Sequence, residues 1–172
     1  VLVIHGGTAR AKGSLTPKRE QEMRAVMLQA LAAGRDALAG EEATAIDGVV
    51  AAICILEDSP LFNAGRGAVF TADERNELDA SLMEGSKLQA GAVAGVTIVK
   101  NPILAARAVM ERTEHVLLVG HGAEQFCREQ ELPYDICGKV IVAVDDKELP
   151  LLDRIYQRGQ ENGVNCQVIG PE

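Results

Sequence analysis

Aromatic residues are scarce in this chain: Phe and Tyr make up only 3% of its 172 residues, and Trp is absent. Apolar residues nevertheless account for 47% of the sequence, which is typical of a globular rather than a disordered protein. The core must therefore consist of aliphatic and small side chains, which allow helices to pack closely on a sheet. A chain of this length fits one domain with its own core.

Basic residues are too few for a protein that binds nucleic acid. The chain has 17 Lys and Arg against 25 Asp and Glu, a formal net charge of −8, whereas phosphate binding requires a basic face. No apolar run approaches the roughly 20 residues that span a membrane. The first seven residues are too short and too uncharged for a signal peptide. We therefore predict a cytoplasmic protein that binds neither nucleic acid nor membranes.

Cysteine and histidine do not occur at the spacing of a metal site. The residues concerned are Cys54, Cys127, Cys137, Cys166, His5, His115 and His121. Neither set forms a zinc motif, and scattered cysteines are typical of reduced thiols in a cytosolic protein. Ser81 lacks the Gly-x-Ser-x-Gly elbow of serine hydrolases, which argues against serine chemistry.

Helix and strand signals alternate along the chain. Thr16-Pro17 predicts a helix with Thr as cap and Pro in its first turn. Thr44 and Asp47 predict a second helix that begins with a capping box and ends before Ser59-Pro60. Further helices are expected from 101, over 122–130 and over 147–162, and strands over 1–5, 67–71, 78–83, 91–99, 115–119, 139–144 and 164–169. This alternation predicts a mixed α/β or α+β domain.

The segment 56–70 is the strongest candidate for a site. It leaves a helix, passes Ser59-Pro60 and turns through Asn63, Gly65 and Gly67. Carbonyl groups that point inward around such a loop suit a hard cation, which prefers oxygen ligands. The alternative is a turn that only hydrogen-bonds to itself. Asn63 likewise fits either a turn residue or a positioned amide.

Two shorter patterns are weaker candidates. Gly6 and Gly7 follow the first predicted strand, and their backbone amides would be accessible to a ligand, but the third glycine of a dinucleotide fingerprint is missing. Glu77 and Asp79 share one face of a strand. They would form either an acid and base pair or exposed charge that favours solubility.

Five segments, taken in order, resemble the plant-type asparaginases, which are isoaspartyl peptidases of the N-terminal-nucleophile hydrolase superfamily. The segments are 5–7, 56–71, 77–85, 90–96 and 100–103. The resemblance covers residues 1–126, with a departure at Thr8-Ala9-Arg10, where the family has Ala-Gly. It implies an α+β fold, the α-subunit half of a four-layer αββα sandwich, made by a precursor that cleaves itself into α and β subunits.

The resemblance also implies a reaction. The family hydrolyses L-asparagine and β-aspartyl (isoaspartyl) dipeptides in an (αβ)2 heterotetramer, without a catalytic cofactor. A threonine at the start of the β subunit attacks the amide, its own α-amine acts as the base, and an oxyanion hole stabilises the intermediate. No Gly-Thr-Val-like segment supplies that threonine here. The prediction is therefore an α subunit that is inactive without a β subunit.

Individual residues are assigned by the same resemblance. Asn63 matches the asparagine that positions the nucleophile, and Gly6 and Gly7 match a glycine pair packed near the scission site. The family's structural Na⁺ is bound by backbone carbonyls, which match those of Leu56, Glu57, Ser59, Phe62, Ala64 and Arg66.

The end of the chain has a different resemblance. Residues 126–172 are similar to an internal segment of the FAD-dependent L-2-hydroxyglutarate oxidases, without the flavin fingerprint or a catalytic base, so no oxidase activity follows. We expect two regions, an asparaginase α-subunit-like region over 1–126 and an α/β tail over 127–172. The alternative for the whole chain is a non-enzymatic chimeric or engineered α/β fragment. An isolated α half would leave a sheet edge unpaired, which predicts self-association.

Overall fold

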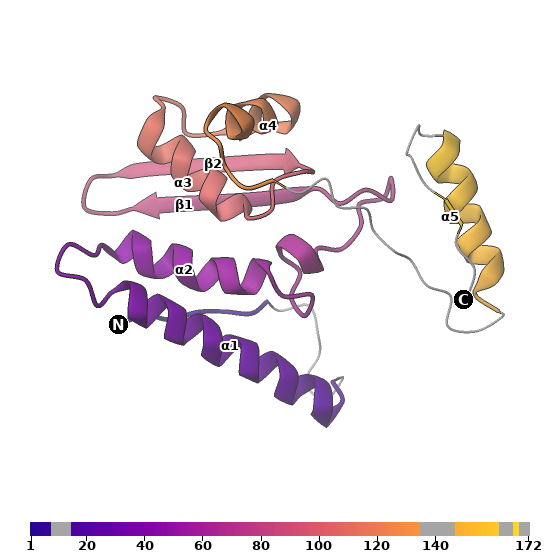
Figure 1. Ribbon diagram of the computed structural model, residues 1–172, viewed down its shortest axis with the longest axis horizontal. Helices are drawn as coiled ribbons and strands as arrows, with labels where there is room; N and C mark the ends of the chain where they lie inside the picture. The colour runs from indigo at the N-terminus through magenta and orange to yellow at the C-terminus, as the bar shows by residue number, and fades with distance from the viewer. Residues whose placement is uncertain (8–14, 135–146, 162–166, 169–172) are drawn as a thin grey trace. The chain divides into compact units, whose positions relative to one another are not determined.

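The computed structural model describes residues 1–7, 15–134, 147–161 and 167–168. The chain forms two compact units, Val1–Ile136 and Cys137–Glu172. The described part of the first unit contains four α-helices and a three-stranded sheet, and that of the second contains one α-helix (Figure 1). The fold is α+β, as predicted.

The helices are α1 (Pro17–Ala37), α2 (Ala45–Glu57), α3 (Pro102–Arg112), α4 (Gly120–Glu129) and α5 (Leu149–Glu161), with a 3-10 turn, η1 (Gly65–Gly67). The strands are β1 (Leu78–Glu84), β2 (Gln89–Val96) and β3 (Leu118–Val119). β1 and β2 form an antiparallel hairpin, and β3 lies parallel to the other edge of β2. The predicted helices are all present, with bounds shifted by a few residues.

The first two helices begin at the predicted caps. The hydroxyl of Thr16 accepts a hydrogen bond from the backbone amide of Arg19 at 3.2 Å, and Pro17 occupies the first turn. At α2 the amide of Thr44 donates to Asp47 Oδ2 at 2.8 Å, and the amide of Asp47 donates back to Thr44 Oγ1 at 3.4 Å. Both arrangements satisfy amides that have no partner within the helix.

α1 and α2 lie side by side in the first unit (Figure 1). A Cβ at Gly34 of α1 would lie 2.7 Å from the carbonyl oxygen of Gly48 in α2, so the two helices pack at van der Waals distance only because Gly34 has no side chain. Beside this crossing, Ala30, Ala52, Leu56 and Phe62 form a small apolar core.

α3 lies on one face of the sheet, and α2 contributes to the same apolar cluster. Leu82 of β1 packs with Ile46 and Val50 of α2 and with Ile103 of α3 in one apolar cluster. A Cβ at Gly91 of β2 would collide with the backbone of α3, so glycine allows that helix to lie directly on the sheet. The alternate residues of β1, Asp79, Ser81 and Met83, are exposed on the opposite face.

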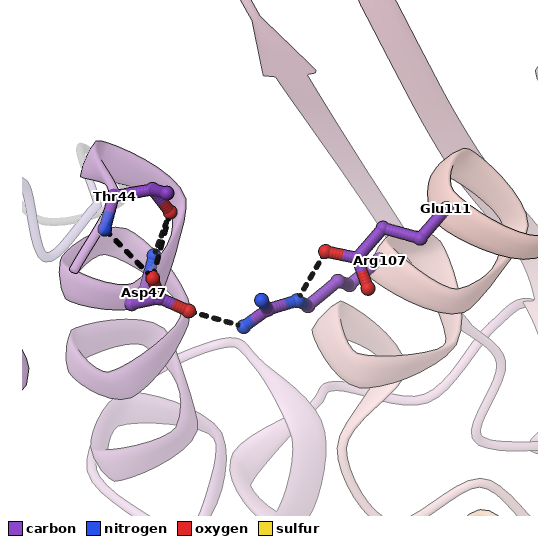
Figure 2. Close-up of polar contacts among 4 residues, drawn as sticks. All are labelled: Thr44, Asp47, Arg107 and Glu111. Atoms are coloured by element: carbon purple, nitrogen blue, oxygen red, sulfur yellow. Dashed lines mark hydrogen bonds and ion pairs between the residues drawn. The ribbon is translucent and has the colours of Figure 1, made fainter. Parts of the chain in front are cut away.

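An ion-pair network joins α2 to α3 (Figure 2). Arg107 contacts Asp47 Oδ1 through Nη1 at 2.8 Å and Glu111 Oε1 through Nε at 2.7 Å. Asp47 thus caps its own helix and pairs with the next. Hydrogen bonds from Thr44, together with Arg107, lower the pKa of Asp47 to about 2 against a smaller opposing effect of burial.

Three strand predictions were wrong in whole or in part. Residues 1–5 are extended but form no strand with any described residue: Leu2 and Ile4 pack against the α1–α2 core, whereas Val1 and Val3 are exposed. Residues 67–71 follow η1 as an irregular segment, because the loop turns at Gly65–Gly67. The strand at 115–119 is reduced to Leu118–Val119, since the hydroxyl of Thr113 binds the amide of His115 and bends the chain.

The predictions at the end of the chain are tested only in part. The helix predicted over 147–162 is confirmed as α5. The strand predicted over 139–144 lies outside the described residues, and of that over 164–169 only Gln167 and Val168 are described, in no strand. The four-layer sandwich and the boundary at 126/127 stay predictions.

Candidate functional site

A cavity of about 730 Å³ lies beside the N-terminal segment, α1 and the loop that follows α2. Its wall includes the predicted residues Gly6, Gly7 and Asn63, which are far apart in the sequence, and Arg19 from the first turn of α1. This volume is in the range of small-molecule sites. The structure therefore brings the glycine pair and the asparagine together at one concave surface.

The glycine pair packs against the loop through its backbone. A Cβ at Gly6 would lie 2.8 Å from Cε1 of Phe62, so this position has no space for a side chain. Gly7 has a φ of +98°, a conformation that other residues rarely adopt, and its amide donates to His5 Nδ1 at 3.3 Å. Glycine is needed at the first position for space and at the second for backbone conformation.

Asn63 closes the loop. Its Oδ1 accepts a hydrogen bond from the amide of Val69 at 2.9 Å, and the residue is exposed. The turn role that the sequence left open is therefore present in the structure. The role of Asn63 in positioning a nucleophile stays a prediction.

The carbonyl groups of the loop converge on two glycines. Gly65 has a φ of +47°, and a Cβ there would lie 2.5 Å from the carbonyl oxygen of Glu57. A Cβ at Gly67 would collide with the carbonyl oxygen of Phe62 and would lie 2.9 Å from that of Ser59. Three of the six predicted carbonyl oxygens thus lie where a side chain at Gly65 or Gly67 would block them, so the two glycines leave these oxygens uncovered, as cation binding by backbone oxygens requires.

The other predicted carbonyls also belong to this loop. The carbonyl oxygen of Leu56 accepts from the amide of Ser59 at 3.3 Å, and that of Ala64 accepts from the amide of Gly67 at 3.0 Å. Each retains a second lone pair. Arg66, the sixth, lies in η1 with an exposed side chain. Within the described ranges no cluster of three His, Cys, Asp or Glu residues would hold a metal.

The side chain of Glu57 is a feature that the sequence did not single out. The residue is only 3% exposed, its Oε1 accepts from the amide of Ile103 at 3.1 Å, and its Oε2 is buried without a partner among the described residues. Burial raises the pKa of Glu57 to about 7; hydrogen bonds from Ile103 and Asn101 oppose this rise, and the charge of Asp58 adds to it. Its one sequence signal is an acidic residue at the end of an otherwise apolar helical stripe.

Glu77 and Asp79 line a second cavity of about 210 Å³, together with Glu57 and Asn63. Asp79 Oδ1 accepts from the amide of Gly95 at 2.8 Å, beside an irregularity in the β1–β2 register. Asp79 therefore stabilises the hairpin where the strands leave regular pairing. An acid and base role for the pair stays a prediction.

The environment of the described cysteines disfavours the thiolate form. Cys54 and Cys127 are free thiols, and burial raises the pKa of both, that of Cys54 to about 11. A buried thiol with a raised pKa is a poor nucleophile. The other two cysteines lie outside the described residues. None of the helices in the described ranges is long and apolar enough to cross a membrane.

Several known proteins are similar to this chain in sequence. The sequence matches the profile of a family described as asparaginase over residues 1–146. It is 50% identical over 133 residues to the isoaspartyl peptidase of Escherichia coli, a match that covers 73% of this chain and 39% of the relative. It is 47% identical over 136 residues to the plant-type L-asparaginase of Pyrococcus abyssi, covering 78% and 43%.

The match to a mammalian relative covers more of this chain. The isoaspartyl peptidase/L-asparaginase of Rattus norvegicus is 39% identical over 149 residues, covering 87% of this chain and 44% of the relative. The chain thus spans about two fifths of the length of these relatives. The matched profile continues past residue 126, where a change of resemblance was predicted.

Proposed function

This chain belongs to the asparaginase family, and from that premise we propose that it is the α half of a threonine-type amidohydrolase acting on L-asparagine and β-aspartyl dipeptides. The names of the relatives support these two substrate classes. One structural observation carries the proposal: Gly6, Gly7 and Asn63, the residues that match the family's reaction centre, line a single cavity.

The nucleophilic threonine enters this cavity from the second half of the enzyme. Its oxygen forms a bond to the side-chain carbonyl carbon of the substrate, the C–N bond breaks, and the leaving amine takes the proton that the threonine α-amine removed from the hydroxyl. Water then hydrolyses the ester and frees aspartate. Gly6 and Gly7 allow the second half to approach their backbone, and Asn63 holds the nucleophile through its side-chain amide.

A structural Na⁺ belongs to the same proposal. The carbonyl oxygens of Leu56, Glu57, Ser59, Phe62, Ala64 and Arg66 would bind it. The absence of a side chain at Gly65 and Gly67, where a Cβ would collide with carbonyl oxygens of the loop, supports this. The ion supplies no chemistry to the reaction. It would hold the loop that carries Asn63 in one conformation.

The uncovered face of the sheet supports the proposed assembly. Asp79, Ser81 and Met83 are exposed on the face opposite α3, where a second sheet would complete a four-layer sandwich. We place the second sheet and the threonine in a β subunit, two copies of each half forming an (αβ)2 enzyme in the cytoplasm.

The proposal is tested by reconstitution. The chain is co-expressed with the part of the Escherichia coli relative that it does not cover, and the release of ammonia from asparagine and of amino acid from a β-aspartyl dipeptide is measured. Activity of the assembly, and none from the chain alone, is the expected result. Ammonia release by the purified chain alone would contradict the α-half assignment, and an assembled complex inactive on both substrates would contradict the function.

A further inference from the structure

Arg19 is the only Lys, Arg, Asp or Glu among the described residues that line the 730 Å³ cavity. The whole chain carries a formal net charge of −8, so this cationic lining differs from the average charge of the protein. A single cation in a concave site attracts an anionic group of a ligand.

The structure of α1 does not by itself explain a cation at this position. A helix N-terminus carries a partial positive charge and favours acidic residues in its first turn. Thr16 binds the backbone amide of Arg19, not its guanidinium. The guanidinium is paired with Glu22 at 3.8 Å, and both side chains are about two fifths exposed, at 41% and 42%. Such a pair contributes little to stability, so the guanidinium is available to a stronger acceptor.

The cavity wall next to Arg19 is apolar. Along with the glycine pair and Asn63, the lining includes Leu15, Met23, Leu61 and Val69. These side chains would contact an apolar group of a ligand. The cavity therefore combines a reaction centre, an apolar wall and one cation.

We propose that Arg19 is a specificity-determining residue whose guanidinium binds the free α-carboxylate of the amino acid that leaves when a β-aspartyl dipeptide is cleaved. This inference rests on the proposed function. Asparagine releases ammonia and has no such carboxylate, whereas a dipeptide is longer by one residue, about 3.5 Å of extended chain. The planar guanidinium matches a carboxylate with two parallel hydrogen bonds. The site thus favours β-aspartyl dipeptides with an apolar second residue over asparagine.

The test compares three substrates in the assembled enzyme: asparagine, β-aspartyl-leucine and β-aspartyl-leucinamide, which lacks the free carboxylate. Arg19→Ala should lower kcat/KM for β-aspartyl-leucine about tenfold, the size of a lost charge-assisted hydrogen bond, chiefly by raising KM. Hydrolysis of asparagine and of the leucinamide should be unchanged. Arg19→Lys should restore part of the loss, because it returns the charge without the planar fork.

Lys18→Ala is the matched control. Lys18 is the neighbouring residue, its side chain is 88% exposed, and like Arg19 it pairs with Glu22, but it does not line the cavity. The variant therefore removes the same charge and a similar ion pair without removing a cavity residue. If Lys18→Ala lowers dipeptide hydrolysis as much as Arg19→Ala, the effect is long-range and the inference is wrong. Equal loss on all three substrates, or no loss on β-aspartyl-leucine, would also overturn it. A wild-type assembly inactive on every substrate would overturn the proposed function and this inference together.

Discussion

Glu57, the last residue of α2, accepts a hydrogen bond from the amide of Ile103 in the first turn of α3 at 3.1 Å, and both residues are buried. Pro102 has no amide hydrogen, so Ile103 provides the first free donor of α3. The end of one helix thus caps the start of the next. The backbone carbonyl of Glu57 also lies against Gly65. Glu57 therefore connects α3 to the carbonyl loop, the segment 56–67 that carries the predicted cation ligands.

Replacing Glu57 separates its hydrogen bond from its charge. Glu57→Ala leaves the amide of Ile103 buried without an acceptor and should be less stable than Glu57→Gln by about 2 kcal/mol at any pH. Glu57→Gln keeps the acceptor and removes the charge. The pKa of Glu57 rises from 4.5 unfolded to about 7 folded, so the folded state binds the extra proton and wild-type stability falls as pH increases through this window. At pH 8 the Gln variant should be more stable than wild type, by at most about 3 kcal/mol.

Urea unfolding at pH 5.5 and pH 8, at constant Na⁺, measures this difference. The advantage of Glu57→Gln over wild type should shrink at the lower pH, where the wild-type carboxyl is neutral. A Gln variant that is less stable than wild type at pH 8 would show that the buried Oε2 needs a positive or donor partner.

Asp47 gives the opposite pH dependence. Its pKa is lowered to about 2, chiefly by Thr44, so its contribution to stability is present above pH 4 and is lost as the pH falls toward 2. Asp47→Asn should destabilise the chain at pH 7 by about 1 kcal/mol, a value kept small because the side chain is 31% exposed. In thermal unfolding between pH 7 and pH 2, the difference in stability between Asp47→Asn and wild type should shrink as the pH falls. The exposed Glu42→Gln serves as the control, and an equal effect there would exclude a specific role for the capping box.

Replacing Gly67 tests whether the carbonyl loop binds a cation. A Cβ there collides with the carbonyl oxygen of Phe62, so Gly67→Ala should destabilise the loop by about 1–3 kcal/mol and abolish stabilisation by Na⁺. The rise in Tm between Na⁺-free buffer and 100-fold excess Na⁺ over the apparent Kd measures the second effect. Gly85→Ala is the control, because a Cβ at Gly85 meets no atom within 4 Å. An unchanged Na⁺ response in Gly67→Ala would place the cation elsewhere.

Local signals predicted the helices and the hairpin well. Thr16-Pro17 and Thr44 with Asp47 are short-range chemistry, which the sequence contains in full. The strand prediction for residues 1–5 failed because their continuous apolar run matches a buried strand, but a strand also needs a neighbour that supplies hydrogen bonds. The proximity of Gly6 to Phe62, and of Glu57 to Ile103, depends on contacts between residues more than 40 positions apart, which no local pattern encodes.

Asn63 has one role in the structure and a second that we propose, and one pair of variants separates them. Its Oδ1 accepts the amide of Val69, whereas the proposed contact with the nucleophile needs the side-chain amide. Asn63→Asp keeps an acceptor and removes the amide donor, so loop stability should be within about 0.5 kcal/mol of wild type while the assembled enzyme loses activity. Asn63→Ala removes both and should lower stability by about 1 kcal/mol as well as activity. Thermal unfolding and asparagine hydrolysis of the two variants check this. An Asp variant with wild-type activity would show that Asn63 serves the reaction only by closing the loop.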